Sequence, residues 1–144
     1  MNPAVASVPT DDTVELKIPA RAEWVAVARL AVAAVASRLH FSVDEIEDIK
    51  LAIAEACTNC IQHGSDSDRI EITSEITQDE VRVSVRDRGV AHKLESVEKA
   101  TGFAEGRRTE ELGVFLIRAL MDEVTYRVDA REGTELIMIK RVAA

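Results

Sequence analysis

Apolar and polar residues alternate along five stretches of the chain, and this alternation predicts strands with one buried face. The five stretches are TVELKIP (13–19), RIEITSEIT (69–77), EVRVSVRD (80–87), EVTYRVDA (123–130) and TELIMIKR (134–141). Successive side chains of a strand point to opposite faces of a sheet, so each stretch is expected to turn its apolar residues toward a core. The proline that ends the first stretch marks it as an edge strand.

Three other stretches have the features of helices. Residues 20–40 combine alanines with apolar side chains on nearly all sides, which predicts a largely buried helix with Arg29 as its one mid-helix charge. A second helix is expected after Ser42, because Glu45 follows it at capping-box spacing and apolar residues then recur every three or four positions. Residues 112–122, LGVFLIRALMD, return to a helical pattern.

The order of these elements predicts an α+β fold. It reads β-α-α-β-β-loop-α-β-β, which is typical of a two-layer sandwich with three helices on one face of a mostly antiparallel sheet. Residues 88–111 are rich in charged and small residues and have no clear period. A loop of this length is more often a functional lid or a disordered segment than a simple connection. Residues 1–11 lack the features of a signal peptide and are expected to form a disordered leader before one domain, residues 12–142.

Composition narrows the class of protein. The chain has 144 residues, of which 47% are hydrophobic, and a net charge of -8. A nucleic-acid interface needs a basic patch to neutralise phosphates, so this charge argues against direct binding of DNA or RNA. No apolar run reaches the ~18 residues of a membrane span. The two cysteines give no disulfide framework, which favours a reducing compartment, the cytoplasm.

The stretch LAIAEACTNCIQHG, residues 51–64, places an acid and an amide one turn apart in an otherwise apolar helix. Glu55 and Asn59 are four residues apart and therefore share a helix face. They form either a surface stripe that faces water or part of a cleft. In a cleft, a carboxylate is able to act as a base, and an amide oxygen is able to bind Mg²⁺, which prefers oxygen ligands.

Three further features carry weaker signals. Asp87 and Gly89 end a predicted central strand, where turn residues are common. Gly113 opens the last helix, where free backbone N–H groups bind phosphate, although a glycine there also provides backbone freedom alone. Cys57 and Cys60 have the spacing of a metal-binding pair, but the sequence has no second pair of ligands, so small packing cysteines are the preferred interpretation.

Together these motifs resemble a known family. EACTN followed by QHG, then DRG, then LGVFLIRALMDEV, then GT occur in the order of the four nucleotide-binding boxes of the GHKL ATPases. Within that superfamily the chain is similar to the bacterial anti-sigma factor serine kinases of the RsbW type, above all in FSVDEIEDIKLAIAEACTN and FLIRALMDEV. The resemblance covers roughly residues 12–142 and implies the Bergerat ATP-binding fold.

The resemblance also implies a role for each matching residue. Glu55 would activate the attacking hydroxyl, Asn59 would bind the Mg²⁺ held by the ATP phosphates, and Asp87 would accept a hydrogen bond from the adenine amino group. Residues 88–111 would form the ATP lid. Arg29 matches an arginine that contacts partner proteins in related kinases. The ATP-binding residues implied in this way are Asn59, His63, Asp87, Gly89, Arg108, Leu112, Gly113, Val114 and Thr134.

The function implied is that of an ATP-dependent serine kinase that is also an anti-sigma factor. Such a protein sequesters a sigma factor and phosphorylates a serine of a STAS-type anti-anti-sigma protein. Unphosphorylated antagonist draws the kinase off the sigma factor, and phosphorylation releases the antagonist, a mechanism called partner switching. The resemblance further implies ATP and Mg²⁺ as cofactors and a homodimer.

Two departures from the family pattern keep other hypotheses open. Ala91 stands where a second glycine is common, and Glu110 and Glu111 stand where small residues usually precede the helix glycine. Two carboxylates beside a triphosphate repel it unless a cation such as Arg107 or Arg108 offsets them. The alternative is an anti-sigma binding module without kinase activity, which either binds nucleotide or acts without it. A purely structural α+β domain is the third hypothesis.

Overall fold

The strands of the protein form one antiparallel sheet. The structure is a computed structural model, and it describes residues 12–63, 68–87, 114–129 and 133–143. Within these residues the strand order is β1-β2-β3-β5-β4, with β1 at an edge as predicted. The strands are β1 (Thr13–Pro19), β2 (Arg69–Thr77), β3 (Glu80–Asp87), β4 (Glu123–Asp129) and β5 (Gly133–Arg141). The alternating pattern therefore predicted all five strands, with bounds that differ by no more than one residue.

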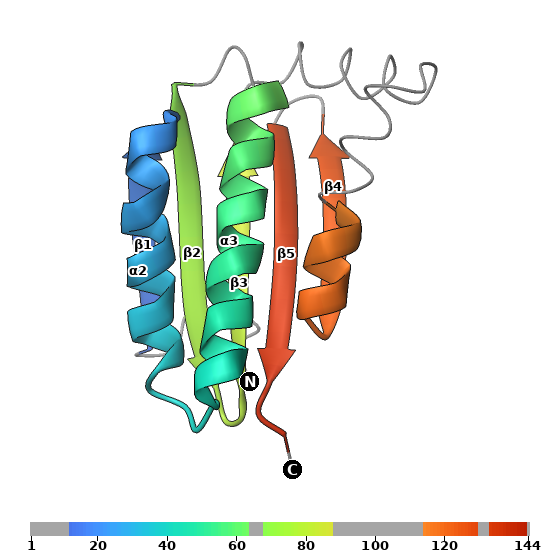
Figure 1. Ribbon diagram of the computed structural model, residues 1–144. Coiled ribbons are helices and arrows are strands. Elements are labelled where there is room, and N and C mark those ends of the chain that lie inside the picture. The colour runs from blue at the N-terminus through green and yellow to red at the C-terminus, as the bar shows by residue number, and fades with distance from the viewer. Residues whose placement is uncertain (1–11, 64–67, 88–113, 130–132, 144) are drawn as a thin grey trace, which may run out of the picture.

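The helices lie together on one face of the sheet (Figure 1). They are the 3₁₀ helix η1 (Ala22–Trp24), α2 (Val25–Ala36), α3 (Val43–His63) and a helical segment of residues 114–120. α2 packs on β1 and β2, and α3 packs on β3. This arrangement confirms the predicted two-layer α+β sandwich. Among the described helices, none is long and apolar enough to cross a membrane.

Aliphatic side chains fill the space between the two layers. Val81, Val83 and Val85 of β3 are buried, as their alternation predicts. Ile49 and Ile53 of α3 belong to the same buried cluster. Aromatic residues make up only 3% of the chain, so branched aliphatic residues must supply most of the hydrophobic stabilisation, at about 25 cal/mol per Å² of apolar surface buried.

The predicted capping box fixes the start of α3. The backbone N–H of Glu45 donates a hydrogen bond to the Ser42 hydroxyl at 3.1 Å, and the backbone N–H of Ser42 donates to the Glu45 carboxylate at 2.8 Å. Both N–H groups lack a partner within the helix, and the capping box satisfies them. Asp44 and Glu45 also place negative charge at the positive end of the helix dipole. α3 therefore starts at a defined residue and continues for 21 residues.

The helix predicted over residues 20–40 is shorter than expected. The chain is extended at Arg21, and η1 precedes the α-helix proper. At the other end, the Ser37 hydroxyl donates to the carbonyl of Ala33 at 2.7 Å, a local bond that competes with continued helix. No glycine or proline follows residue 36 closely enough to signal this end in the sequence.

The prediction that this helix is largely buried is wrong. Within α2, the buried residues are Ala28, Val32 and Ala36. The reason is the position of the helix in the sandwich. α2 packs on the edge strand β1 and its neighbour β2, and α3 is the helix beside it. Its outer flank therefore has no described element to cover it (Figure 1).

Candidate functional site

Four of the predicted site residues, Glu55, Asn59, Asp87 and Thr134, come from elements that meet at one end of the molecule. β3 ends and β5 begins at this end, where the C-terminal half of α3 also lies (Figure 1). In the β3–β5 register Asp87 stands opposite Thr134. Gly133, directly before it, has a φ of 92°, a conformation that favours glycine. The backbone bend that leads into Thr134 therefore depends on that glycine.

Asp87 and Thr134 are polar side chains inside the core. Asp87 is 0% exposed and Thr134 is 4% exposed. Asp87 makes interactions within the protein, whereas the Thr134 hydroxyl is buried without a hydrogen bond among the described residues. An unsatisfied buried polar group costs about 1–3 kcal/mol. A hydroxyl retained at that cost beside a buried carboxylate fits a pocket that a polar ligand completes.

Glu55 and Asn59 lie on the flank of α3 between its buried row and solvent. Both are half-buried, while their neighbours Ala56 and Cys60 are buried. Asp48 is half-buried on the same face, seven residues before Glu55. A water-facing stripe would expose these side chains more fully, so their partial burial favours the cleft over the surface interpretation.

Several predicted site residues lie outside the described residues. They are Gly89, Arg108, Leu112 and Gly113, together with the predicted leader 1–11, the predicted lid 88–111, Ala91 and the pair Glu110 and Glu111. The side chain of His63 is likewise outside the description, although its backbone ends α3. Val114 is half-buried and is the first described residue of the helical segment. The assignments outside the description therefore stay predictions.

The four described residues form a chemically coherent set. A buried carboxylate accepts a hydrogen bond from an amine, and a neighbouring hydroxyl donates or accepts one more. A half-buried carboxylate is suited to accept a proton, and an amide oxygen is suited to Mg²⁺. In the part of the chain that the structure describes, no group of three or more His, Cys, Asp or Glu side chains gathers to hold a metal. A magnesium ion at Asn59 would therefore take most of its ligands from phosphate and water, as this ion commonly does.

The two cysteines are packing residues of α3. Both are free and buried. Burial, together with a smaller effect of the neighbouring Cys60, raises the pKa of the Cys57 thiol to about 12. A thiol that is protonated at neutral pH is a poor nucleophile and a poor metal ligand. The structure therefore agrees with the preference for packing cysteines over a metal pair.

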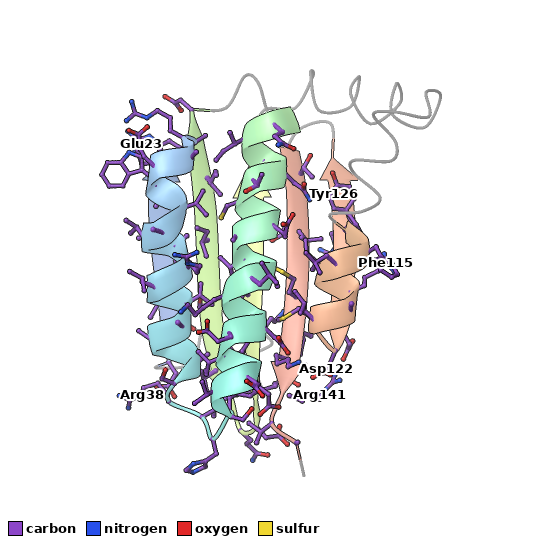
Figure 2. All side chains as sticks on the ribbon, in the orientation of Figure 1. Glu23, Arg38, Phe115, Asp122, Tyr126 and Arg141 are labelled. Carbon is purple, nitrogen blue, oxygen red and sulfur yellow. The ribbon has the colours of Figure 1, made fainter. Side chains whose placement is uncertain are left out.

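Sequence reasoning missed an exposed apolar stripe on α2 and η1. Trp24 is 38% exposed, Val27 is 40% exposed and Leu30 is 60% exposed. They recur every three residues along η1 and α2. Glu23 and Arg38, which Figure 2 labels, lie just before and just after α2. The sequence contained a signal for this stripe, because the helix has a second apolar face opposite its core face. Packing on one sheet buries only one face of a helix.

Arg29 directly precedes Leu30 on α2 and lies about 100° around the helix axis from it. It is half-buried, and its Nε atom is buried without a hydrogen-bond partner among the described residues. A guanidinium carries five N–H donors and needs acceptors for them.

The sequence is similar to a known protein family and to known proteins over most of its length. It matches the family described as the histidine kinase-like ATPase domain over residues 18–140. It is 38% identical over 141 residues to a serine-protein kinase RsbW from Oceanobacillus iheyensis, covering 92% of this chain and 88% of that protein. It is also 38% identical over 139 residues to a serine-protein kinase RsbW from Bacillus cereus, covering 91% of this chain and 86% of that protein.

A comparison with solved structures agrees on the fold. The crystal structure of the RsbU and RsbW domains of a protein from Mycobacterium tuberculosis matches with a TM-score of 0.63 and 20% sequence identity. The match covers 90% of this chain and 31% of that longer chain. Because the identity is low and the present chain spans less than a third of that protein, this likeness shows the shared fold alone.

Proposed function

The chain belongs to the histidine kinase-like ATPase domain family and, within it, to the RsbW serine-protein kinases, and on this premise we propose that it is an ATP-dependent serine kinase and an anti-sigma factor. Its substrate is a serine of a STAS-type anti-anti-sigma protein, and its second partner is a sigma factor. The observation that carries the proposal is the buried Asp87 beside the unsatisfied Thr134 hydroxyl, at the end of the sheet where Glu55 and Asn59 also lie.

The four residues divide the work of phosphoryl transfer. ATP supplies the phosphoryl group, and Mg²⁺ offsets the charge of the phosphates. The serine oxygen attacks the γ-phosphorus, the bond to the β–γ bridging oxygen breaks, and ADP leaves. Glu55 accepts the proton of the serine hydroxyl. Asn59 would hold the metal ion through its amide oxygen, Asp87 would accept a hydrogen bond from the adenine amino group, and Thr134 would line the adenine pocket.

Replacing Glu55 with alanine is expected to abolish transfer while ATP binding is largely retained. The carboxylate acts on the serine hydroxyl rather than on the nucleotide, and loss of a general base costs about 10²–10⁴-fold in rate. Transfer of labelled phosphate from ATP to a STAS-type antagonist measures the rate, and calorimetry measures ATP binding.

Asp48→Ala is the matched control for this substitution, because Asp48 is a half-buried carboxylate on the same face of α3. The control is expected to transfer phosphate at the wild-type rate. Persistent transfer by Glu55→Ala would show that another group is the base.

The exposed stripe of Trp24, Val27 and Leu30 supports a protein-binding role for α2. Exposed apolar side chains that gather in one patch are typical of interaction sites. Arg29, the half-buried residue before Leu30, adds a cation to this helix, which suits an acidic group on the partner. We place the sigma factor and the antagonist on this flank, where competition between them would permit partner switching.

Arg29→Ala and Leu30→Asp are each expected to weaken binding of the sigma factor by at least about tenfold, the effect of losing one hot-spot residue. ATP affinity is expected to stay unchanged, because α2 contributes no residue to the nucleotide site. Val43→Asp is the control, since Val43 is an exposed apolar residue, 79% exposed, at the start of α3. Equal binding by Leu30→Asp and the control would remove α2 from the interface.

The open face of the sheet supports a homodimer. Lys17, Glu71, Arg86, Glu135 and Arg127 stand side by side across β1, β2, β3, β5 and β4. Their charges alternate, and Arg86 and Glu135 form an ion pair at 3.4 Å. Four of them, Glu71, Arg86, Glu135 and Arg127, border a cavity of about 480 Å³ on the face away from the helices. The dimer would have a twofold axis that runs parallel to the strands, between β3 and β5. Arg86 of one protomer would then face Glu135 of the partner subunit, and Glu71 would face Arg127 of the partner subunit.

Arg86→Glu is expected to shift the protein toward monomer, because the substitution places like charges together within and between protomers. Adding Glu135→Arg restores opposite charges and is expected to restore the dimer. Sedimentation equilibrium over a dilution series measures both. Arg38→Glu changes an exposed charge at the end of α2 and serves as the control. A monomeric wild type, or a single variant that dimerises as tightly as wild type, would contradict this interface.

The second candidate function is an anti-sigma binding module without kinase activity. The specific observation in its favour is the pair Glu110 and Glu111, whose charge opposes a triphosphate. This alternative predicts sigma-factor binding that depends on α2 and no phosphate transfer by the wild type. The transfer assay described for Glu55 therefore separates the two functions.

A further inference from the structure

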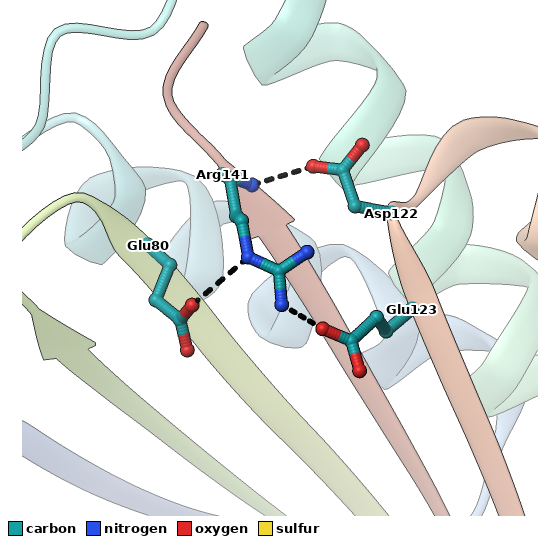
Figure 3. Close-up of polar contacts among 4 residues, drawn as sticks. All are labelled: Glu80, Asp122, Glu123 and Arg141. Carbon is teal, nitrogen blue, oxygen red and sulfur yellow. Dashed lines mark hydrogen bonds and ion pairs between the residues drawn. The ribbon is translucent and has the colours of Figure 1, made fainter. Parts of the chain in front are cut away.

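Three hydrogen bonds fasten the end of the helical segment 114–120 to the end of β5. The Lys140 ammonium donates to the carbonyl of Leu120 at 2.7 Å. The backbone N–H of Asp122 donates to the carbonyl of Ile139 at 2.8 Å. The backbone N–H of Arg141 donates to the Asp122 carboxylate at 2.6 Å, as Figure 3 shows. We call these contacts the β5 clamp.

The Arg141 side chain extends the clamp across the sheet (Figure 3). Its Nε lies 3.3 Å from the Glu80 carboxylate of β3, and its terminal nitrogen pairs with Glu123 of β4. Arg141 is nearly half exposed, so each of these ion pairs alone is weak. Their common effect is to hold the ends of three strands together next to the helix end.

Lys140 is the unusual member of the clamp. It stands opposite the buried Val81, on the helix side of the sheet, where the alternation of β5 calls for an apolar residue like Met138. A charged ammonium is favourable there because the C-terminal carbonyls of a helix carry partial negative charge and lack partners within the helix. Lys140 therefore matches a helix end rather than the core.

The clamp and the candidate nucleotide site lie at opposite ends of one strand. β5 places Thr134 in the site and Lys140 in the clamp, six residues later. Ile117 of the helical segment and Met121, directly after it, are buried. Within the described part of the chain, polar contacts tie its C-terminal end to the sheet. These contacts and the buried Ile117 hold the described part of the segment, so a change at its C-terminal end is expected to move Val114 as well.

We infer that Lys140 is a positioning residue for the nucleotide: it fixes the helical segment on β5 and so sets where the start of that helix stands relative to Asp87 and Thr134. This inference rests on the proposed function, because the start of the helix belongs to the stretch that the kinase family uses for phosphate. Lys140 itself touches no reacting atom. Its effect is on where the helix sits, and a helix displaced by about 1 Å is enough to weaken a well-aligned site.

Lys140→Met keeps the length of the side chain and removes its charge and donors. It is expected to raise the KM for ATP about tenfold while kcat at saturating ATP stays close to wild type, since a displaced helix weakens nucleotide binding without removing the base. Lys140→Arg supplies N–H donors at the same place and is expected to restore much of the affinity. If Lys140→Met and Lys140→Arg raised the KM for ATP equally, this would contradict a role of Lys140 through the Leu120 carbonyl.

Two controls separate positioning from general loss of stability. Lys50→Met removes another partly buried lysine, whose ammonium pairs with Glu47 at 2.9 Å on α3, and is expected to leave KM unchanged. Ile72→Val lowers the melting temperature through the core and is expected to lower the active fraction without moving KM. An unchanged KM in Lys140→Met, or an equal rise in Ile72→Val, would overturn the inference.

Hydrogen exchange at the amides of Met121 and Asp122, measured without nucleotide, reports on the clamp independently of catalysis. Faster exchange in Lys140→Met than in Lys50→Met is expected, because the Leu120 carbonyl loses its partner and the helix end frays. If the wild type bound no ATP, the proposed function would fail and the positioning role with it, while the exchange data would still establish the clamp. Equal exchange in the two variants would overturn the clamp itself.

Discussion

A carboxylate buried at the end of the central strand is the constraint around which this protein is organised. Asp87 is 0% exposed and closes β3, which has β2 on one side and β5 on the other. A charged group in such a place requires polar neighbours, because desolvation of an unpaired charge is very costly. The β3–β5 register places a second polar residue, Thr134, opposite Asp87, after a glycine with positive φ, and the Thr134 hydroxyl has no hydrogen bond among the described residues. The pairing of β3 with β5 therefore also brings together the two polar side chains of the pocket.

The two-layer fold separates three surfaces with different tasks. The end of the sheet near Asp87 holds the residues suited to a nucleotide. The outer flank of α2 exposes Leu30 and its apolar neighbours because it lies at the side of the sandwich. The face of the sheet away from the helices carries a row of alternating charges. In the proposed kinase these surfaces serve ATP, the partner proteins and the second protomer, so that each binding event leaves the other surfaces available.

The sequence predicted the features that depend on neighbours along the chain. Alternation located the five strands, and the Ser42–Glu45 spacing located the start of α3 with its two hydrogen bonds. Prediction from the sequence failed where the burial of a residue depends on the position of its helix in the sandwich. The apolar residues of α2 were expected to be buried, because periodicity cannot tell a central helix from one at the side of the sheet. Lys140 gave no signal either, since its partner is a backbone carbonyl 20 residues away, and no side-chain pattern marks a carbonyl.

The measurement that tests the central claim most directly is calorimetric titration of Mg-ATP into the wild type and into Asp87→Asn. Asparagine keeps the shape of the side chain but replaces one acceptor oxygen with a donor. The account predicts that the wild type binds and that the variant loses at least about tenfold in affinity, as expected for a hydrogen bond to a charged group. Its melting temperature should show that it remains folded. Equal binding by the folded variant, or no binding by the wild type, would contradict the assignment of this buried carboxylate to the adenine pocket.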